Sequence, residues 1–157
     1  MLRVKIREAA LNDADDIAEL YPRWGFELTR ERIMRSLMST RERRYVAELD
    51  GKVVAHVFVK RGTGYHKHLA HLYSLIVHPD YRNKGIATKL LKYVLAHLPE
   101  DIEIALAQVQ HDNKASLSVF KKLGFERYGY LKNAWKDGTE YKHNVLLKKE
   151  LKKRRKR

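Results

Sequence analysis

The fold of this chain is decided by VHPDYRNKGIATKLL, residues 77–91, which joins an apolar segment to an amphipathic one. Residues 71–77, HLYSLIV, are rich in aliphatic and aromatic side chains and predict a buried strand that ends at Pro79 and Asp80. Apolar residues then recur at helical spacing, at Ile86, Leu90, Leu91, Val94 and Leu95. The stretch therefore predicts a strand, a turn and a helix.

The predicted turn has the chemistry of an anion site. The first N–H groups of a helix have no intrahelical acceptor, and the helix dipole adds partial positive charge there. Gly85 and Ala87 allow a ligand to approach the backbone closely, and Arg82 and Lys84 add charge. A plain helix start with solvated lysines is the alternative interpretation. Neither GxxxxGK followed by Ser or Thr nor GxGxxG occurs, so the pattern favours a phosphorylated cofactor outside those two nucleotide classes.

Residues 77–91 resemble the acetyl-CoA motif of the GNAT superfamily of N-acetyltransferases. That motif ends in Arg or Gln, two variable residues, Gly, one variable residue, and Gly or Ala. Arg82, Gly85 and Ala87 fill these three positions. A second block, NKASLSVFKKLGF at residues 113–125, resembles the family's other signature, in which Asn and Ala open a helix that ends in Gly-Phe. Two blocks at the family's usual separation are more specific than either alone, and the resemblance covers nearly the whole chain.

The remaining sequence predicts a mixed α/β fold. Helices are expected after Asn12 or Asp13, after Thr29 and over residues 113–123. Strands are expected around Val4 and Ile6 and over residues 44–49, 53–60, 102–110, 127–131 and 141–148, with an Asp50-Gly51 hairpin turn and LKNAWKDGTE joining the last two. The resemblance implies a central splayed, mostly antiparallel sheet flanked by about four helices. We expect one domain over residues 1–150 and a mobile basic tail over residues 151–157.

The resemblance also implies which residues hold acetyl-CoA. Leu75, Ile76 and Val77 would offer backbone groups to pantetheine. The pyrophosphate would lie against Arg82, Asn83, Lys84, Gly85, Ile86, Ala87 and Thr88. Asn113 and Phe120 of the second block would contact the cofactor, and Asn113 also has the position of a plain helix cap. No metal is expected, and the chain has no cysteine.

The catalytic acid and base stay open at this stage. Many family members carry a Tyr where this chain has Phe120, and the ribosomal-protein N-terminal acetyltransferases carry a Glu base where it has Gln108. Neither replacement exchanges a proton in the required way. His111, Tyr73 and Tyr128 are the first candidates to take over, with His71, Tyr130 and Tyr141 as further ones. The alternatives are that no strong base is required, or that transfer is lost and only cofactor binding remains.

The leading hypothesis is an acetyl-CoA-dependent N-acetyltransferase in which a primary amine attacks directly in a ternary complex. We expect a protein or peptide N-terminal amine as the acceptor, ahead of a small-molecule amine. The rival hypothesis is a catalytically weak acyl-CoA-binding or RNA-associated module. An acidic cluster around the first helix, Glu8, Asp13, Asp15, Asp16 and Glu19, is either a solvated face or a border of the acceptor cleft. Trp24 and Phe26 would wall that cleft or pack in the core.

Charge concentrates at the C-terminus. Residues 148–157 hold eight Lys or Arg and one Glu, a net +7 that is half of the chain's formal +14. Such a tail is either solvated or makes salt-dependent, non-specific contact with RNA or ribosomes. No run of 18 apolar residues and no signal-peptide pattern occurs, so we expect no membrane association and a cytoplasmic location, as a monomer or homodimer.

Overall fold

The computed structural model describes residues 3–21 and 29–151. Its contacts divide the chain into two compact units. Unit 1 comprises Met1–Lys60 and Ser74–His97, and unit 2 comprises Arg61–Tyr73 and Leu98–Arg157. The predicted single domain over residues 1–150 stays a prediction. Trp24, Phe26 and the tail residues 152–157 lie outside the described residues.

The strands within the described residues form one seven-stranded sheet. Their order in the sheet is β1 (Lys5–Glu8), β2 (Glu42–Leu49), β3 (Lys52–Arg61), β4 (Leu69–Val77), β5 (Ile104–Gln110), β7 (Glu140–Glu150) and β6 (Glu126–Asp137). The pairs β1–β2, β2–β3, β5–β7 and β6–β7 are antiparallel, whereas β4 (Leu69–Val77) and β5 (Ile104–Gln110) pair in parallel. That parallel ladder joins Leu69 through Leu72 to Ile104 through Ala107. A mixed, mostly antiparallel sheet with four α-helices in the described part of the chain confirms the predicted fold class.

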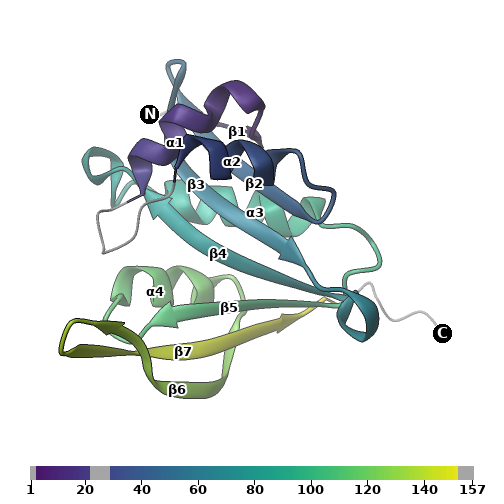
Figure 1. Ribbon diagram of the computed structural model, residues 1–157, viewed down its shortest axis with the longest axis vertical. Helices are drawn as coiled ribbons and strands as arrows, with labels where there is room; N and C mark the ends of the chain where they lie inside the picture. Colours follow the sequence, from purple (N-terminus) through teal and green to yellow (C-terminus); the bar gives the residue numbers. More distant parts are fainter. Residues whose placement is uncertain (1–2, 22–28, 152–157) are drawn as a thin grey trace. The chain divides into compact units, whose positions relative to one another are not determined.

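In unit 1, helices pack on both faces of the strands. The strands are β1 (Lys5–Glu8), β2 (Glu42–Leu49), β3 (Lys52–Arg61) and the end of β4. Helices α1 (Ala14–Leu20) and α2 (Arg30–Leu37) cover one face, and α3 (Ile86–His97) covers the other (Figure 1). The core on the α1–α2 side is formed by Ala14, Ile17, Ile33, Val46 and Val53. These apolar residues lie at the helical and strand periodicity that the sequence shows.

The local signals of unit 1 are mostly confirmed. Thr29 caps α2, because its hydroxyl accepts a hydrogen bond from the Arg32 N–H at 3.2 Å. Asp50 (φ 52°) and Gly51 (φ 78°) form the predicted two-residue turn between β2 and β3. Asp13 precedes α1 as predicted, but its side chain makes no cap bond to that helix. Its role in the ion pairs is described below.

Unit 2 contains β5, α4 (Lys114–Lys122), β6 (Glu126–Asp137) and β7 (Glu140–Glu150). Gly124 ends the helix segment with φ 93°, the left-handed conformation expected of a C-terminal stop. The predicted LKNAWKDGTE connection is wrong in extent, because β6 runs through most of it and only Gly138 and Thr139 form the turn. The β6–β7 register shifts between Leu131 and Trp135, and Asn133 there has φ 58°. This irregularity lets pairing continue where the sequence suggested a loop.

Candidate active site

The predicted cofactor strand β4 contains a local distortion. Ser74 has φ 54°, a left-handed conformation that a non-glycine residue rarely adopts within a strand. Ala70 and Leu72 are buried, whereas Leu75, Ile76 and Val77 after the distortion are only half-buried. The buried strand predicted over residues 71–77 is therefore buried only in part. Its last residues keep surface that a ligand can contact.

The turn after β4 is held by its own hydrogen bonds. The His78 N–H donates to the Val54 carbonyl at 2.8 Å, which fixes the end of β4 to β3. The His78 imidazole accepts from the Asp80 N–H at 3.1 Å and starts the short 3₁₀ helix Pro79–Tyr81. Arg82 Nε then donates to the Val77 carbonyl at 3.1 Å. Three hydrogen bonds thus fix the turn on the N-terminal side of α3.

Left-handed residues shape the start of α3. Asn83 (φ 60°) and Gly85 (φ 79°) both have positive φ, and such residues alternate with ordinary ones where backbone N–H groups form an anion-binding concavity. The Lys89 N–H donates to the Gly85 carbonyl at 3.1 Å, the first bond of the helical ladder. The N–H groups of Ile86, Ala87 and Thr88 precede that bond and have no acceptor within the helix. They form the donor set that the sequence predicted.

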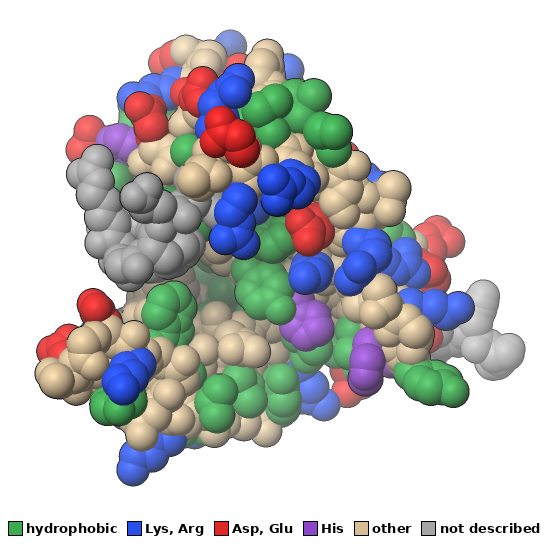
Figure 2. All heavy atoms as spheres, in the orientation of Figure 1, with side chains coloured by type: hydrophobic (Ala, Val, Ile, Leu, Met, Phe, Trp, Pro, Cys, Tyr) green, Lys and Arg blue, Asp and Glu red, His purple; other side chains and the backbone are tan. Residues whose placement is uncertain are grey.

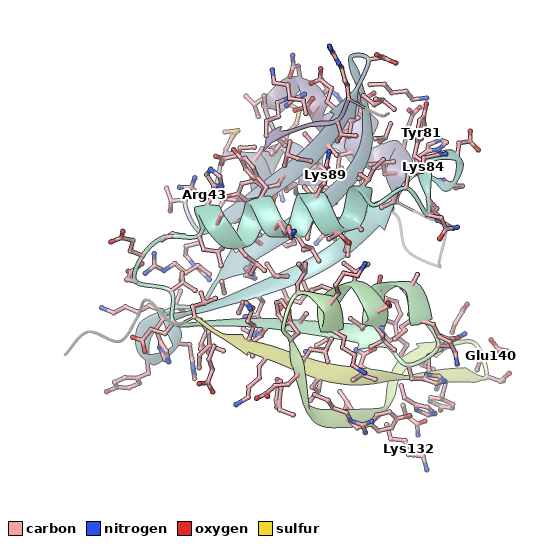
Figure 3. All side chains as sticks on the ribbon, turned by 180° about the vertical axis from the view of Figure 1, so that it is seen from behind. Arg43, Tyr81, Lys84, Lys89, Lys132 and Glu140 are labelled. Carbon is pink, nitrogen blue, oxygen red and sulfur yellow. The ribbon has the colours of Figure 1, made fainter. Side chains whose placement is uncertain are left out.

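These residues fit a pyrophosphate. A Cβ atom built on Gly85 would meet nothing within 4 Å, so the space beside this backbone is open. Arg82, Asn83, Lys84 and Gly85 are exposed, whereas Ile86 is buried and anchors the helix start. Figure 3 shows Lys84 beside Tyr81 at the turn into α3. The predicted strand, turn and helix residues 75–88 therefore follow one another within unit 1, and all of them except Ile86 are exposed or half-buried.

The second predicted block lies in unit 2. The Asn113 side chain accepts from the Ser116 N–H at 3.1 Å and caps α4, as its position predicted. Phe120 is buried, and its ring packs edge-on against Phe125 with 5.0 Å between the ring centroids. Its side chain is thus a core side chain of unit 2. Contacts of Asn113 and Phe120 with a cofactor stay predictions.

The catalytic candidates also lie in unit 2, in different surroundings. His111 is exposed, and its imidazole lies 4.9 Å from that of His143 between ring centroids. Tyr73 is half-buried and stacks on His71, and burial raises the pKa of its hydroxyl, so that it stays protonated at neutral pH. Tyr128 is 51% exposed. Nothing in this geometry singles out one of the three, and their roles stay predictions.

Gln108, which occupies the position of the missing Glu base, has a structural partner. Its Oε1 accepts from Asn144 Nδ2 at 3.1 Å, across the ladder between β5 and β7. Asn144 is buried, and among the described residues its Oδ1 is the buried side-chain atom that lacks a hydrogen-bond partner. The amide of Gln108 is thus held in the sheet by a hydrogen bond.

The acidic cluster of the sequence is largely paired with arginines. Arg7 holds the Asp13 carboxylate through two hydrogen bonds, at 2.7 and 3.0 Å, and the pKa of Asp13 is lowered as a result. Glu8 lies 3.3 Å from Arg43, and Asp15 lies 2.9 Å from Arg30. Figure 2 shows acidic and basic side chains interspersed over α1 and α2. The pairs of Glu8 and Asp15 are exposed, as expected of a solvated face, whereas Asp13 is buried.

A polar cluster inside unit 1 was not predicted from the sequence. Arg44 and His56 lie in β2 and β3, are 4% and 0% exposed, and are hydrogen bonded to each other at 3.0 Å. His56 Nδ1 also lies 3.2 Å from the carbonyl of Ser74, the distorted residue of β4. The signal was present, since a histidine within the apolar run VVAHVFV is unusual for a strand covered on both faces.

Within residues 3–21 and 29–151, no helix is long and apolar enough to cross a membrane. In the same part of the chain, no group of three or more His, Asp or Glu side chains could hold a metal ion.

Comparison with known proteins agrees with this geometry. The chain is 28% identical over 154 residues to an N-alpha-acetyltransferase of Sulfurisphaera tokodaii, with 87% of this chain and 88% of the relative covered. Its fold matches the ribosomal-protein-alanine N-acetyltransferase of Brucella melitensis with a TM-score of 0.84 at 22% identity, over 94% of this chain and 99% of that one. It also matches yncA of Salmonella typhimurium, solved with its cofactor acetyl-CoA, with a TM-score of 0.82 at 17% identity, over 94% of this chain and 93% of the other. Residues 9–125 match the Acetyltransferase (GNAT) family. The chain belongs to this family of acetyltransferases.

Proposed function

We propose that this protein transfers the acetyl group of acetyl-CoA to the N-terminal α-amine of a protein or peptide. The observation that carries the proposal is the local structure of residues 75–88, where a half-buried strand end leads into an exposed turn with two left-handed residues and then into the first turn of α3. The family uses acetyl-CoA as its acetyl donor. Similarity to the N-alpha-acetyltransferase of Sulfurisphaera tokodaii supports an α-amine acceptor.

Different residues of unit 1 would bind different parts of acetyl-CoA. The N–H groups of Ile86, Ala87 and Thr88 are donors for the pyrophosphate, and the side chains of Arg82 and Lys84 add positive charge. Gly85 keeps the backbone accessible. The backbone of Leu75 through Val77 would bond pantetheine and present an N–H group to the carbonyl oxygen of the thioester, on which negative charge develops.

The reaction needs a neutral amine, a donor for that oxygen and a proton for the departing thiolate. Acetyl-CoA supplies the acetyl group as a thioester. The nitrogen of the amine forms a bond to the acetyl carbon, the carbon–sulfur bond breaks, and one proton passes from the amine to a base while another reaches the thiolate. Tyr73, protonated at neutral pH, is one candidate for the proton donor.

The pKa of the acceptor favours an α-amine over a lysine side chain. An α-amine has a pKa of about 7.7–8.0, and a lysine amine has one of about 10.4. Deprotonation at pH 7.5 costs a lysine about 4 kcal/mol and an α-amine about 0.5 kcal/mol, at about 1.36 kcal/mol per pKa unit. Because Phe120 and Gln108 replace the common Tyr and Glu, a site with a weak base suits the more acidic amine.

The test is release of the CoA thiol with a panel of acceptors. Peptides with a free N-terminus should release thiol, whereas the same peptides with a blocked N-terminus and a free lysine should not. Turnover of small amines alone would establish the small-molecule alternative. Tight binding of acetyl-CoA without turnover across the whole panel would establish the binding module instead.

A further inference from the structure

A chain of buried and half-buried polar groups crosses unit 1 from its helices to β4. Arg44 Nε donates to Ser36 Oγ of α2 at 3.1 Å, and Arg44 Nη1 donates to the Tyr21 hydroxyl at 3.0 Å. The guanidinium carbon lies 4.3 Å from the ring centroid of Phe58. Within residues 3–21 and 29–151, no ion pair joins Arg44 to a carboxylate. Neutral groups and an aromatic face therefore fix this guanidinium in one orientation.

The guanidinium determines which nitrogen of His56 carries the proton. Arginine donates hydrogen bonds and accepts none, so His56 Nε2, which lies 3.0 Å from Arg44 Nη1, must be the acceptor. Burial, with the charge of Arg44 as the second cause, lowers the pKa of His56 to about 3, so the ring is neutral. The single ring proton is then on Nδ1. It is donated to the Ser74 carbonyl at 3.2 Å.

This bond acts on the distorted residue of β4. A non-glycine residue at φ 54° is strained, and such a conformation persists where its surroundings hold it. The Ser74 carbonyl and the Leu75 N–H belong to one planar peptide unit. A donor that fixes the direction of the carbonyl therefore fixes the opposite direction of the N–H. Figure 1 shows β3, which carries His56, beside β4.

We propose that His56 is a positioning residue for acetyl transfer, which orients the Leu75 N–H through the carbonyl of Ser74, with Arg44 holding the imidazole in the required tautomer. This inference rests on the proposed function, in which the backbone of Leu75 through Val77 faces the cofactor. His56 lies in the neighbouring strand β3 and is fully buried, so it would act only through the backbone of β4.

Two nearly isosteric variants each remove one of the two hydrogen bonds of His56 and keep the other. In His56→Asn the amide nitrogen takes the place of Nδ1 and keeps the donor to Ser74, but the acceptor for Arg44 is lost. In His56→Gln the amide oxygen takes the place of Nε2 and keeps the acceptor, but the donor to Ser74 is lost. His66→Gln, at an exposed position in the 3₁₀ helix Gly64–His66, controls for loss of an imidazole.

Turnover with a free N-terminal peptide should respond to the donor bond alone. His56→Gln should lower kcat at least tenfold, with a change of less than about threefold in the KM for acetyl-CoA. His56→Asn should keep kcat within about threefold of the parent, even if it is the less stable variant in thermal unfolding. Equal loss of kcat in the two variants, or no loss in His56→Gln, would overturn the proposal.

A measurement on the unaltered protein tests the tautomer of His56 without relying on turnover. Nitrogen-15 NMR of the His56 ring should show protonated Nδ1 and unprotonated Nε2, and the opposite tautomer would overturn the proposal even if both variants failed to fold. If no peptide is acetylated, the proposed function fails. The inference is then judged by the tautomer and by the Leu75 amide signal, which His56→Gln should shift and His56→Asn should leave close to its parent position.

Discussion

The buried His56 makes the stability of this protein depend on pH in a predictable direction. Burial and the charge of Arg44 lower its pKa from 6.5 to about 3 in the folded chain. In the unfolded chain the ring titrates near its ordinary pKa. Below pH 6.5 the unfolded chain therefore binds a proton that the folded chain does not bind. The contribution of His56 is fully present above pH 6.5 and is lost as the pH falls from there toward 3.

The size of the loss follows from the two pKa values. A pH of 5 lies about 1.5 units below the pKa of 6.5 that the ring has in the unfolded chain. Each pH unit below that pKa lowers the free energy of unfolding by about 1.36 kcal/mol. The free energy of unfolding should fall by about 2 kcal/mol between pH 8 and pH 5 through His56 alone. The loss should reach about 5 kcal/mol near pH 3, where the folded ring also takes up a proton.

Urea unfolding at pH 8 and pH 5 measures this contribution as a difference between two chains. His56→Gln removes the titrating ring and keeps an acceptor for Arg44, while every other titrating group is common to both chains. The parent should lose about 2 kcal/mol more than His56→Gln between the two pH values. His66→Gln, at an exposed position, should behave like the parent. Equal pH dependence of the parent and His56→Gln would refute a neutral, fully buried imidazole.

Three further predictions concern the cofactor surface, an ion pair and the C-terminus. Gly85→Glu places bulk and negative charge where a pyrophosphate would lie, and calorimetry should show acetyl-CoA binding weakened at least tenfold. Gly51→Glu is a matched control, because Gly51 has nearly the same φ and equally open space at the β2–β3 turn. Equal effects of the two substitutions on acetyl-CoA binding would contradict the anion site. Asp13→Asn breaks the two-bond pair with Arg7 and should lower the free energy of unfolding by about 2 kcal/mol at pH 7, whereas Glu8→Gln in an exposed pair should change it by less than about 0.5 kcal/mol. The pKa of Asp13 is lowered in the fold, so the Asp13 difference should vanish as the pH falls through that lowered pKa, and a pH-independent difference would exclude the ion pair as its cause. Deleting residues 152–157 should remove salt-sensitive RNA binding in a filter assay and leave acetyl-CoA affinity unchanged, and unchanged RNA affinity would rule out the electrostatic tail.

The sequence predicted features that depend on neighbouring residues. The strand, turn and helix of residues 77–91 are encoded locally by Pro79, Gly85 and the helical spacing of apolar residues, and the structure has them in place. The β2–β3 turn at Asp50 and Gly51 is likewise local. Such elements require no knowledge of what packs against them.

The distortion of β4 and the extension of β6 were not predicted, because both depend on contacts between residues far apart in the sequence. The distortion at Ser74 is held by His56, eighteen positions away in the chain, and His56 is in turn held by Arg44. The extension of β6 depends on pairing with β7 around Asn133, whose N–H donates to the imidazole of His143 at 2.9 Å. Neither arrangement has a short sequence pattern, because each depends on which strands the fold places side by side.

The central claim is tested most directly by locating the acetyl group on a peptide that offers two amines. A peptide with a free N-terminus and one internal lysine is incubated with the protein and acetyl-CoA at pH 7.5, and fragment masses identify the modified nitrogen. The account predicts one acetyl group, on the α-amine, with an equal amount of CoA thiol released, and several-fold less of both with Gly85→Glu at the same subsaturating cofactor concentration. Acetylation of the lysine alone, or no acetylation by a protein that binds acetyl-CoA, would contradict it.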